Sequence, residues 1–278
     1  MSRLPLFLLP AALVLLSACR GHKTDAPAAP PDTPVVETAC DTLTDSIATD
    51  EPEPPAAADG VFDDFIFNFM RNRSFQRQRV SFPLPVRDGG TERSLQASEW
   101  RHDRIFSKDD VYALLFDSPK AMSKKAYAGQ DSAVISVLNL TAESVKHYVF
   151  HKERGAWMLT SVSTKAVRDE EGGDFMSFLL RFSASGEFRR SHVAQSFDLV
   201  VLDPDTFEPM QGTADASQWD DYAPELPTDK LALVTHGGVK AGGTERILQV
   251  TSLEGAMSSL ITFRRQGGRW TAVKLENN

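Results

Sequence analysis

The sequence predicts an α+β fold of two tandem units, each a helix packed on a curved antiparallel sheet. Three observations support this prediction. Similar segments recur in the same order in two halves of the chain, apolar residues at helical spacing open each half, and a Gly-containing turn between two strands closes it. The predicted units are residues 60–168 and 169–278.

The repeat rests on four pairs of similar segments. They are Asp64–Arg71 with Asp174–Arg181 at an offset of 110, Phe75–Val80 with Phe188–Val193 at 113, Trp100 with Trp219 at 119, and Gly155–Leu159 with Gly268–Ala272 at 113. The offset changes only where loops would absorb the difference. We therefore interpret the body of the chain as two copies of one unit.

Each unit is expected to begin with a helix and to continue with a strand. Apolar spacing predicts helices over Val61–Asn72 and Asp174–Phe182. Alternating apolar residues over Val80–Val86 predict a strand, which the prolines at 83 and 85 place at a sheet edge or shorten. A helical turn is expected at Lys108–Phe116.

Two strands joined by a tight turn are expected to end each unit. In the first they are Ser144–Lys152 and Trp157–Thr164, and in the second Ser258–Gln266 and Arg269–Leu275. Glycine at each turn, Gly155 in the first unit, permits the positive φ that tight hairpins require.

Residues 1–18 have the pattern of an export signal. Arg3 precedes an apolar run, Leu4–Leu16, that is too short and too Pro-broken to span a membrane. The run ends in Leu16-Ser17-Ala18-Cys19, which resembles the lipobox of bacterial lipoproteins. That resemblance implies acylation of Cys19 and anchoring in a lipid bilayer. The alternative is an ordinary signal peptide that contains a cysteine by chance.

Residues 19–59 are predicted to be a disordered tether behind the lipidated cysteine. Residues 20–59 hold seven prolines, nine acids and two bases, and they lack apolar periodicity. These residues carry a net charge of −7 and the whole chain −8, so most of the net negative charge belongs to this segment. Cys40 lies here as a spare thiol or an intermolecular disulfide partner. The residue after Cys19 is Arg20. In enterobacterial lipoproteins an Asp at this position resembles an inner-membrane retention signal, so its absence favours the outer membrane.

The body resembles a domain-of-unknown-function family of Gram-negative lipoproteins with two tandem cystatin-like, or nuclear-transport-factor-2-like, halves. The matching segments are Phe62–Phe65, Phe75–Leu84, Trp100–Asp103, Tyr112–Phe116, Gly155–Leu159, Trp219, Pro224–Pro227 and Phe263–Arg265. The resemblance covers residues 60–276. It implies a fold and an envelope location, but no activity.

Familiar catalytic and cofactor signatures are absent from the sequence. It contains no phosphate-binding loop, no dinucleotide fingerprint, no nucleophile elbow and no zinc-protease motif, and it has no Lys/Arg-dense stretch. We therefore expect no cofactor and no nucleic-acid partner. His147 and His151 have the spacing of a helical metal pair, but they fall on a predicted strand, so we expect no metal.

Two aromatic-polar clusters are the candidate ligand-binding positions. They contain Trp100, His102 and Asp103 in the first unit, and Trp219 and Tyr222 in the second. An aromatic face beside hydrogen-bonding groups is typical of glycan and peptide pockets, whereas a repeated core Trp is the alternative. His102 and Asp103 would form a general-base pair, unless strand alternation points them to opposite faces.

Arg77 and Arg79 are a further candidate site. Strand alternation would place both on one face, where they would clamp an anion or form a salt-bridged edge.

The sequence thus predicts an outer-membrane-anchored lipoprotein that acts as a non-catalytic binding module for an envelope protein, peptide or glycan. The alternative is a small-molecule isomerase or hydrolase that uses a pocket in the first unit around His102 and Asp103.

Overall fold

The computed structural model describes residues 59–106, 111–123, 129–170, 173–236, 242–252 and 258–277, all of which belong to one compact unit, residues 50–278. Its helices are α1 (Phe62–Arg71), α2 (Arg73–Gln78), α4 (Gly173–Ala184), α5 (Gly186–Ser191) and α6 (Trp219–Tyr222), and its 3₁₀ turns include η3 (Val167–Asp169) and η4 (Ala216–Gln218). Its strands are β1 (Leu84–Asp88), β2 (Thr91–Leu95), β3 (Val111–Phe116), β4 (Ser132–Asn139), β5 (Ser144–Glu153), β6 (Ala156–Ala166), β7 (Val193–Leu202), β8 (Pro209–Asp215), β9 (Lys230–His236), β10 (Glu245–Ser252), β11 (Ser258–Gln266) and β12 (Arg269–Asn277). The α+β class is confirmed.

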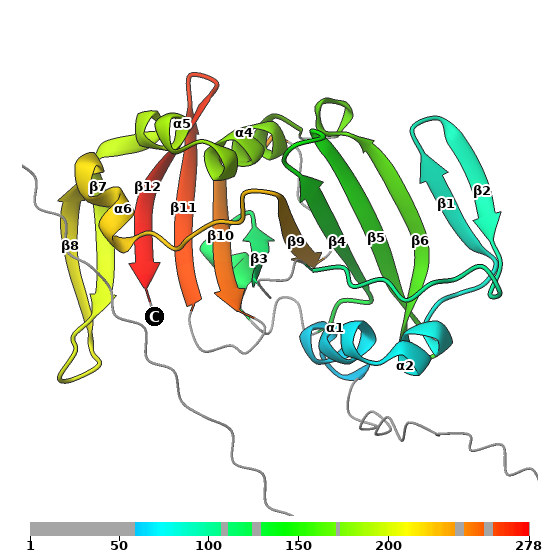
Figure 1. Ribbon diagram of the computed structural model, residues 1–278. Coiled ribbons are helices and arrows are strands. Elements are labelled where there is room, and N and C mark those ends of the chain that lie inside the picture. Colours follow the sequence, from blue (N-terminus) through cyan, green and yellow to red (C-terminus); the bar gives the residue numbers. More distant parts are fainter. Residues whose placement is uncertain are drawn as a thin grey trace, which may run out of the picture. The chain divides into compact units, whose positions relative to one another are not determined.

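All twelve strands form one sheet, in the order β2-β1-β6-β5-β4-β9-β3-β10-β11-β12-β7-β8 (Figure 1). Reading inward from the two ends gives the same pattern twice. β1 pairs in parallel with β6, as β7 does with β12, and antiparallel hairpins follow in both cases. The two edges of the sheet are β2 and β8.

The two central strands are exchanged between the halves of the chain. β3 pairs with β9 and β10, and β9 pairs with β3 and β4. Each of these strands therefore lies against strands from the other predicted unit. The predicted boundary at residue 168 falls in η3, yet the sheet continues across the two halves.

The helices cover opposite faces of the sheet. Ala113 and Leu115 of β3 belong to the core beneath α4, whereas Leu114 and Phe116 belong to the core beneath α1 (Figure 1). The parallel pairing of β3 with β9 explains this arrangement. A twofold rotation that relates β3 to β9 must keep the strand direction, because the two strands are parallel. Its axis therefore runs along the strands. Such a rotation turns the sheet over, so a helix on one face in the first half corresponds to a helix on the opposite face in the second.

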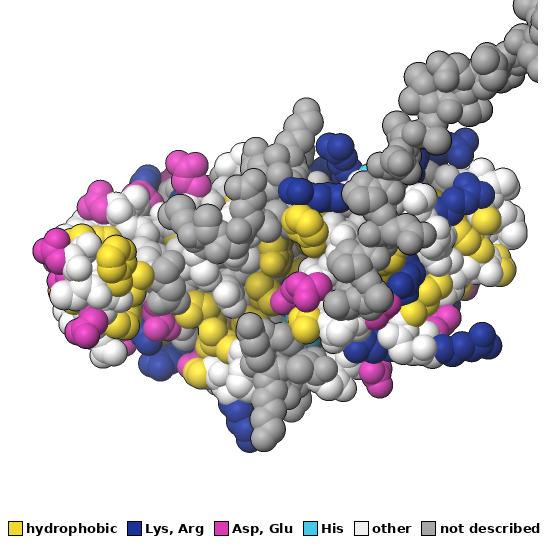
Figure 2. All heavy atoms as spheres, turned by 90° about the horizontal axis from the view of Figure 1, so that it is seen from below, with side chains coloured by type: hydrophobic (Ala, Val, Ile, Leu, Met, Phe, Trp, Pro, Cys, Tyr) yellow, Lys and Arg dark blue, Asp and Glu magenta, His cyan; other side chains and the backbone are white. Residues whose placement is uncertain are grey.

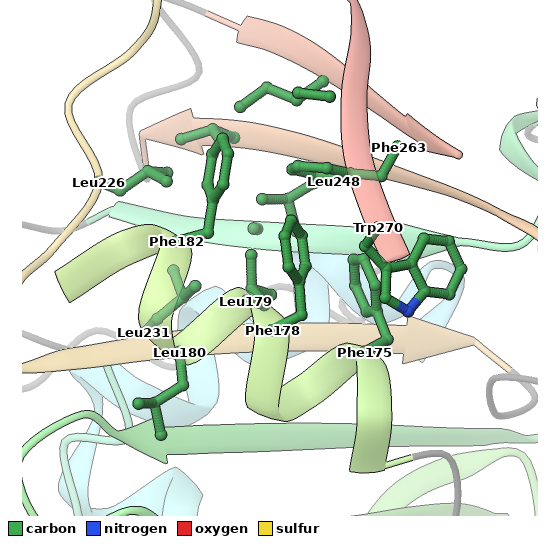
Figure 3. Close-up of a cluster of buried hydrophobic side chains, with 14 of the residues drawn as sticks. Phe175, Phe178, Leu179, Leu180, Phe182, Leu226, Leu231, Leu248, Phe263 and Trp270 are labelled. Atoms are coloured by element: carbon green, nitrogen blue, oxygen red, sulfur yellow. The ribbon is translucent and has the colours of Figure 1, made fainter. Parts of the chain in front are cut away.

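Aromatic packing in the two cores repeats residue by residue. The ring centroids of Phe62 and Trp157 lie 5.0 Å apart at 71°, and those of Phe175 and Trp270 lie 4.9 Å apart at 71°. The same correspondence holds for Phe65–Phe69 and Phe178–Phe182, both 5.4 Å apart. In Figure 3, Phe175, Phe178 and Phe182 extend from α4 near Phe263 and Trp270.

These ring pairs correct the helix alignment. Phe62 corresponds to Phe175, at an offset of 113, whereas the sequence comparison paired Phe65 with Phe175 at 110. The error of three residues is close to one helical turn of 3.6 residues. An apolar stripe that is shifted by one turn matches almost as well as the true one.

The predicted closing hairpins are confirmed as β5–β6 and β11–β12. Their turns have positive φ at two successive residues, Arg154 (54°) and Gly155 (85°) in one, Gly267 (57°) and Gly268 (82°) in the other. Positive φ at both central residues matches the twist of the strands that the turn joins.

Two predicted elements are wrong. The sequence predicts a helical turn at Lys108–Phe116, but the described part of that segment, Val111–Phe116, is strand β3. Its apolar run contacts both cores, and periodicity cannot separate such a run from a buried helix. The strand expected from Val80 begins at Leu84, because α2 continues to Gln78. Asn72 starts α2 by accepting the Phe75 N–H at 2.8 Å.

Candidate functional site

The loop at residues 100–106 carries three of the predicted ligand-binding residues, and α2 fixes its position. Gln76, whose side chain is fully buried, donates to the Asp103 carbonyl and accepts the Asp103 N–H, both at 2.9 Å. Its amide also donates to the Phe69 carbonyl at 3.1 Å. One glutamine thus ties the loop to both helices of the first half.

The Asp103 carboxylate is held by two residues of β5. Its Oδ2 accepts the Tyr148 hydroxyl at 2.6 Å and Lys146 Nζ at 3.0 Å. Burial, followed by the charge of Asp103 and the hydrogen bond to it, raises the pKa of Tyr148 far above its ordinary value. Tyr148 therefore remains a neutral donor, and the three side chains form a hydrogen-bonded polar cluster.

His102 does not join the Asp103 cluster and instead contacts the main chain of α1. Its Nε2 lies 2.9 Å from the Met70 carbonyl, which only accepts, so Nε2 carries the proton. Met70 lies in the last turn of α1, where main-chain carbonyls lack helical partners. His102 and Asp103 thus serve different partners. They lie in a loop, so the strand alternation assumed for them is wrong.

Trp100 is half-buried and packs edge-on against Phe82, with ring centroids 6.2 Å apart. Its Nε1 is buried without an acceptor among the described residues. Trp100 therefore presents a partly accessible apolar face beside the His102–Asp103 loop, and its role in ligand binding stays a prediction.

The predicted clamp of Arg77 and Arg79 rested on strand alternation, and that basis is wrong. Arg77 is exposed on α2, and Arg79 follows the end of the helix. Arg79 makes a bidentate pair with Asp59, Nη1–Oδ1 at 3.0 Å and Nη2–Oδ2 at 2.7 Å, and its guanidinium lies 4.8 Å from the Phe75 ring centroid.

The two residues of the second predicted cluster lie in different environments. Trp219 begins α6 and is 1% exposed, packed against Phe197 and Phe182 with centroids 5.1 and 6.1 Å away. Tyr222 is 37% exposed, and its carbonyl accepts Asn277 Nδ2. The structure therefore places Trp219 in the core and Tyr222 on the surface.

A chain of polar side chains lies on the other face of the first-half sheet, and no sequence pattern predicted it. Ser136 Oγ lies 2.8 Å from His147 Nδ1, and His147 Nε2 lies 2.9 Å from Glu170 Oε2, which also binds Lys165 Nζ at 2.8 Å. Burial would raise the pKa of Glu170, but the hydrogen bonds and charges of His147 and Lys165 outweigh it and lower that pKa. Only the β4–β5 register, which pairs Ser136 with His147, reveals this arrangement.

No group of three His, Cys, Asp or Glu side chains within the described ranges is arranged to hold a metal ion. Among these same residues, no helix is both long and apolar enough to cross a membrane. Cys19, Cys40, the signal segment and nearly all of the predicted tether lie outside them.

Residues 40–277 match the family model described as Domain of unknown function (DUF4348). The chain belongs to this family. Like the sequence resemblance, DUF4348 membership assigns no activity. The match begins inside the segment predicted to be a tether, so the DUF4348 region extends beyond the described body on its N-terminal side.

This DUF4348 chain also resembles the crystal structure of an NTF2-like protein from Bacteroides fragilis NCTC 9343. The TM-score is 0.72 and the sequence identity 32%, over 82% of this chain and 99% of that one. The likeness agrees with the nuclear-transport-factor-2-like resemblance. No curated protein matches the chain.

Proposed function

We propose that this protein is a non-catalytic interaction module of the cell envelope that binds a protein or peptide partner through an open sheet edge. The observation that carries the proposal is the state of β8. This edge strand begins with Pro209 and ends with Asp215, but the residues between them are uncharged, and Met210–Thr213 are exposed. An uncharged, exposed edge segment is a template for an added strand.

Apolar side chains beside β8 support the same proposal. Phe207 is 74% exposed, Met210 46% and Leu202 37%. Figure 2 shows hydrophobic side chains gathered at the left end of the molecule, where β7 and β8 lie. The opposite edge, β2, instead carries Glu92 and Arg93, and charges of this kind discourage strand addition.

The state of the first-half site also favours binding over catalysis. Asp103 and His102 hold the loop through Tyr148, Lys146 and the Met70 carbonyl. Neither side chain hydrogen-bonds to the other, so the general-base pair that an isomerase or hydrolase would use has no geometric support.

The proposal includes two finer points. First, the body is two copies of one cystatin-like unit, supported by ring pairs and hairpins that recur at an offset of 113. Second, residues 1–18 are a signal peptide, and acylated Cys19 anchors the chain in the outer-membrane bilayer through the tether. Only the sequence supports this second point. An intact mass that carries acyl chains and loses them in Cys19→Ser would test it.

Cross-linking in cells tests the interaction. Asp203 N–H donates to the Glu208 carbonyl, so strand alternation turns the main-chain groups of Gln211 and Thr213 outward from β7. Thr213→Pro removes an outward donor, and Met210→Glu places a charge on the edge. Both should abolish cross-links formed at this end while the thermal midpoint changes little.

The matched control is Arg93→Ala on β2, which should leave the cross-links intact. Unchanged cross-links in both β8 variants would refute the edge as the binding surface.

A further inference from the structure

Asp59 occupies a small anion site in the first half. Arg79 donates two hydrogen bonds to its carboxylate, and the Trp157 N–H donates to Oδ1 at 3.1 Å. The Arg79 guanidinium is stacked on Phe75. The site thus combines a cation on an aromatic ring with a main-chain N–H at the start of β6.

The same frame recurs 113 residues later. Ala272 N–H donates to the His192 carbonyl at 2.8 Å, as Leu159 N–H does to the Arg79 carbonyl at 2.8 Å. His192 stacks on Phe188, with ring centroids 3.8 Å apart. His192 therefore stands in the place of Arg79, and Phe188 in the place of Phe75.

The position equivalent to Asp59 carries no carboxylate in the second half. The residue 113 positions after Asp59 is Gly172, which has no side chain. Two described carboxylates of this region pair with other arginines: Asp174 with Arg265 at 3.0 Å and Asp220 with Arg190 at 3.7 Å.

Two arginines supply the positive charge at the second frame. The Arg181 guanidinium lies 4.0 Å from the Phe188 centroid, and Arg269 Nη2 donates to the Ser191 carbonyl. Their counterparts in the first half are Asn68 and Ala156. Within the described part of the chain, neither Arg181 nor Arg269 forms an ion pair with a carboxylate.

A main-chain donor completes the frame. Ala272 N–H points toward α5 and β7, so Trp270 N–H, two residues earlier on β12, points to the same side. The equivalent N–H in the first half, that of Trp157, binds Asp59. Burial, then the charges of Arg269 and Arg181, lower the pKa of His192 against the opposing hydrogen bond to Phe188, so the imidazole is a neutral neighbour of the two guanidinium groups.

We propose that Arg181, Arg269 and the Trp270 N–H, beside His192, bind a carboxylate side chain of an acidic peptide, as Arg79 and the Trp157 N–H bind Asp59. Guanidinium–carboxylate hydrogen bonds supply the specificity, because charge-assisted bonds are about twice as strong as neutral ones. This inference deepens the proposed binding function and rests on it for an external partner.

The test uses residues 19–278 with Cys19→Ser and a peptide that copies the internal ligand. The acetylated, amidated peptide Ala-Ala-Asp-Gly-Val reproduces residues 57–61. In an NMR titration this peptide should shift the signals of the Trp270 amide and the His192 imidazole. The shifts should saturate at a low millimolar peptide concentration. The analogue with Asn for Asp should shift neither.

Arg181→Gln combined with Arg269→Gln should lower the affinity for the Asp peptide at least tenfold. Arg71→Gln with Arg73→Gln, on the helices of the first half, is the matched control and should leave its affinity unchanged. Three results would each overturn the proposal. One is equal binding of the Asn analogue, and another is full affinity in the Arg181/Arg269 variant. The third is the absence of a signal shift at His192 and Trp270 at about 10 mM peptide. The β8 variants report separately on the proposed function, because Met210→Glu should not affect this titration.

Discussion

Arg246 and Asp117 form an ion pair that joins the two halves of the chain. Arg246 Nη1 lies 3.1 Å from Asp117 Oδ1, and the arginine side chain is only 4% exposed. Asp117 follows the exchanged strand β3, and Arg246 stands near the start of β10, which pairs with β3. The guanidinium also lies 5.7 Å from the Trp270 ring centroid, so the pair connects the exchanged strand to the second core.

Asp117→Asn should lower the free energy of unfolding by about 3 kcal/mol, because it leaves the buried Arg246 charge uncompensated. Arg246→Met should cost less, since the carboxylate that it leaves behind is a quarter exposed. The double variant should recover part of the loss, and urea denaturation would measure the coupling. Strict additivity of the two losses would contradict an energetic pair.

Cutting the chain between residues 168 and 169 should leave neither fragment folded. The first fragment would lose β9, which pairs with β4, and the second would lose β3, which pairs with β10. Each fragment would then expose a bare strand edge and half of a hydrophobic core. Mixing the two should restore the sheet, as seen by circular dichroism and cooperative melting. A cooperative transition in residues 169–278 alone would disprove this dependence.

Elements defined by local signals were predictable from the sequence. The hairpins β5–β6 and β11–β12 follow from alternation and glycine turns, and α1 follows from its apolar spacing. Strand β3 was not predictable, because its apolar run is equally compatible with a buried helix. Its exchange with β9 depends on pairing between residues more than a hundred positions apart, which no local pattern encodes.

The candidate site shows the same limit. The sequence identified Trp100, His102 and Asp103 as a cluster, and the structure keeps them in one loop. It could not show that Gln76, 27 positions away, binds both main-chain groups of Asp103. Likewise, the partner of Arg79 is Asp59, at the end of a segment that reads as a tether.

Glu170 should make stability depend on pH. Its pKa is lower in the folded state, so the unfolded chain takes up the proton first as the pH falls. The stabilisation is complete above the ordinary carboxyl pKa and is lost as the pH falls through the folded-state pKa. Glu170→Gln should therefore cost about 1–3 kcal/mol at pH 7, and the difference from the parent should vanish in acid.

Thermal melts of the Glu170→Gln variant and the parent between pH 3 and pH 7 would measure this difference. Glu143→Gln, an exposed change on the turn before β5, is the control and should follow the parent. A Glu170→Gln loss that stays constant over the whole range would mean that the charge of Glu170 contributes nothing.

Gln76 should be the most sensitive residue of the first-half site. Gln76→Ala removes three hydrogen bonds and leaves the main chain of Asp103 and the Phe69 carbonyl without these partners. An unmet buried polar group costs about 1–3 kcal/mol, so we expect a loss near 3 kcal/mol. Gln76→Glu should not rescue it, because a carboxylate cannot donate to the two carbonyls. Gln78→Ala, exposed at the end of α2, should change stability by less than about 0.5 kcal/mol. If Gln76→Ala were as mild as Gln78→Ala, the loop at residues 100–106 would be held by Tyr148, Lys146 and the contact of His102 with the Met70 carbonyl.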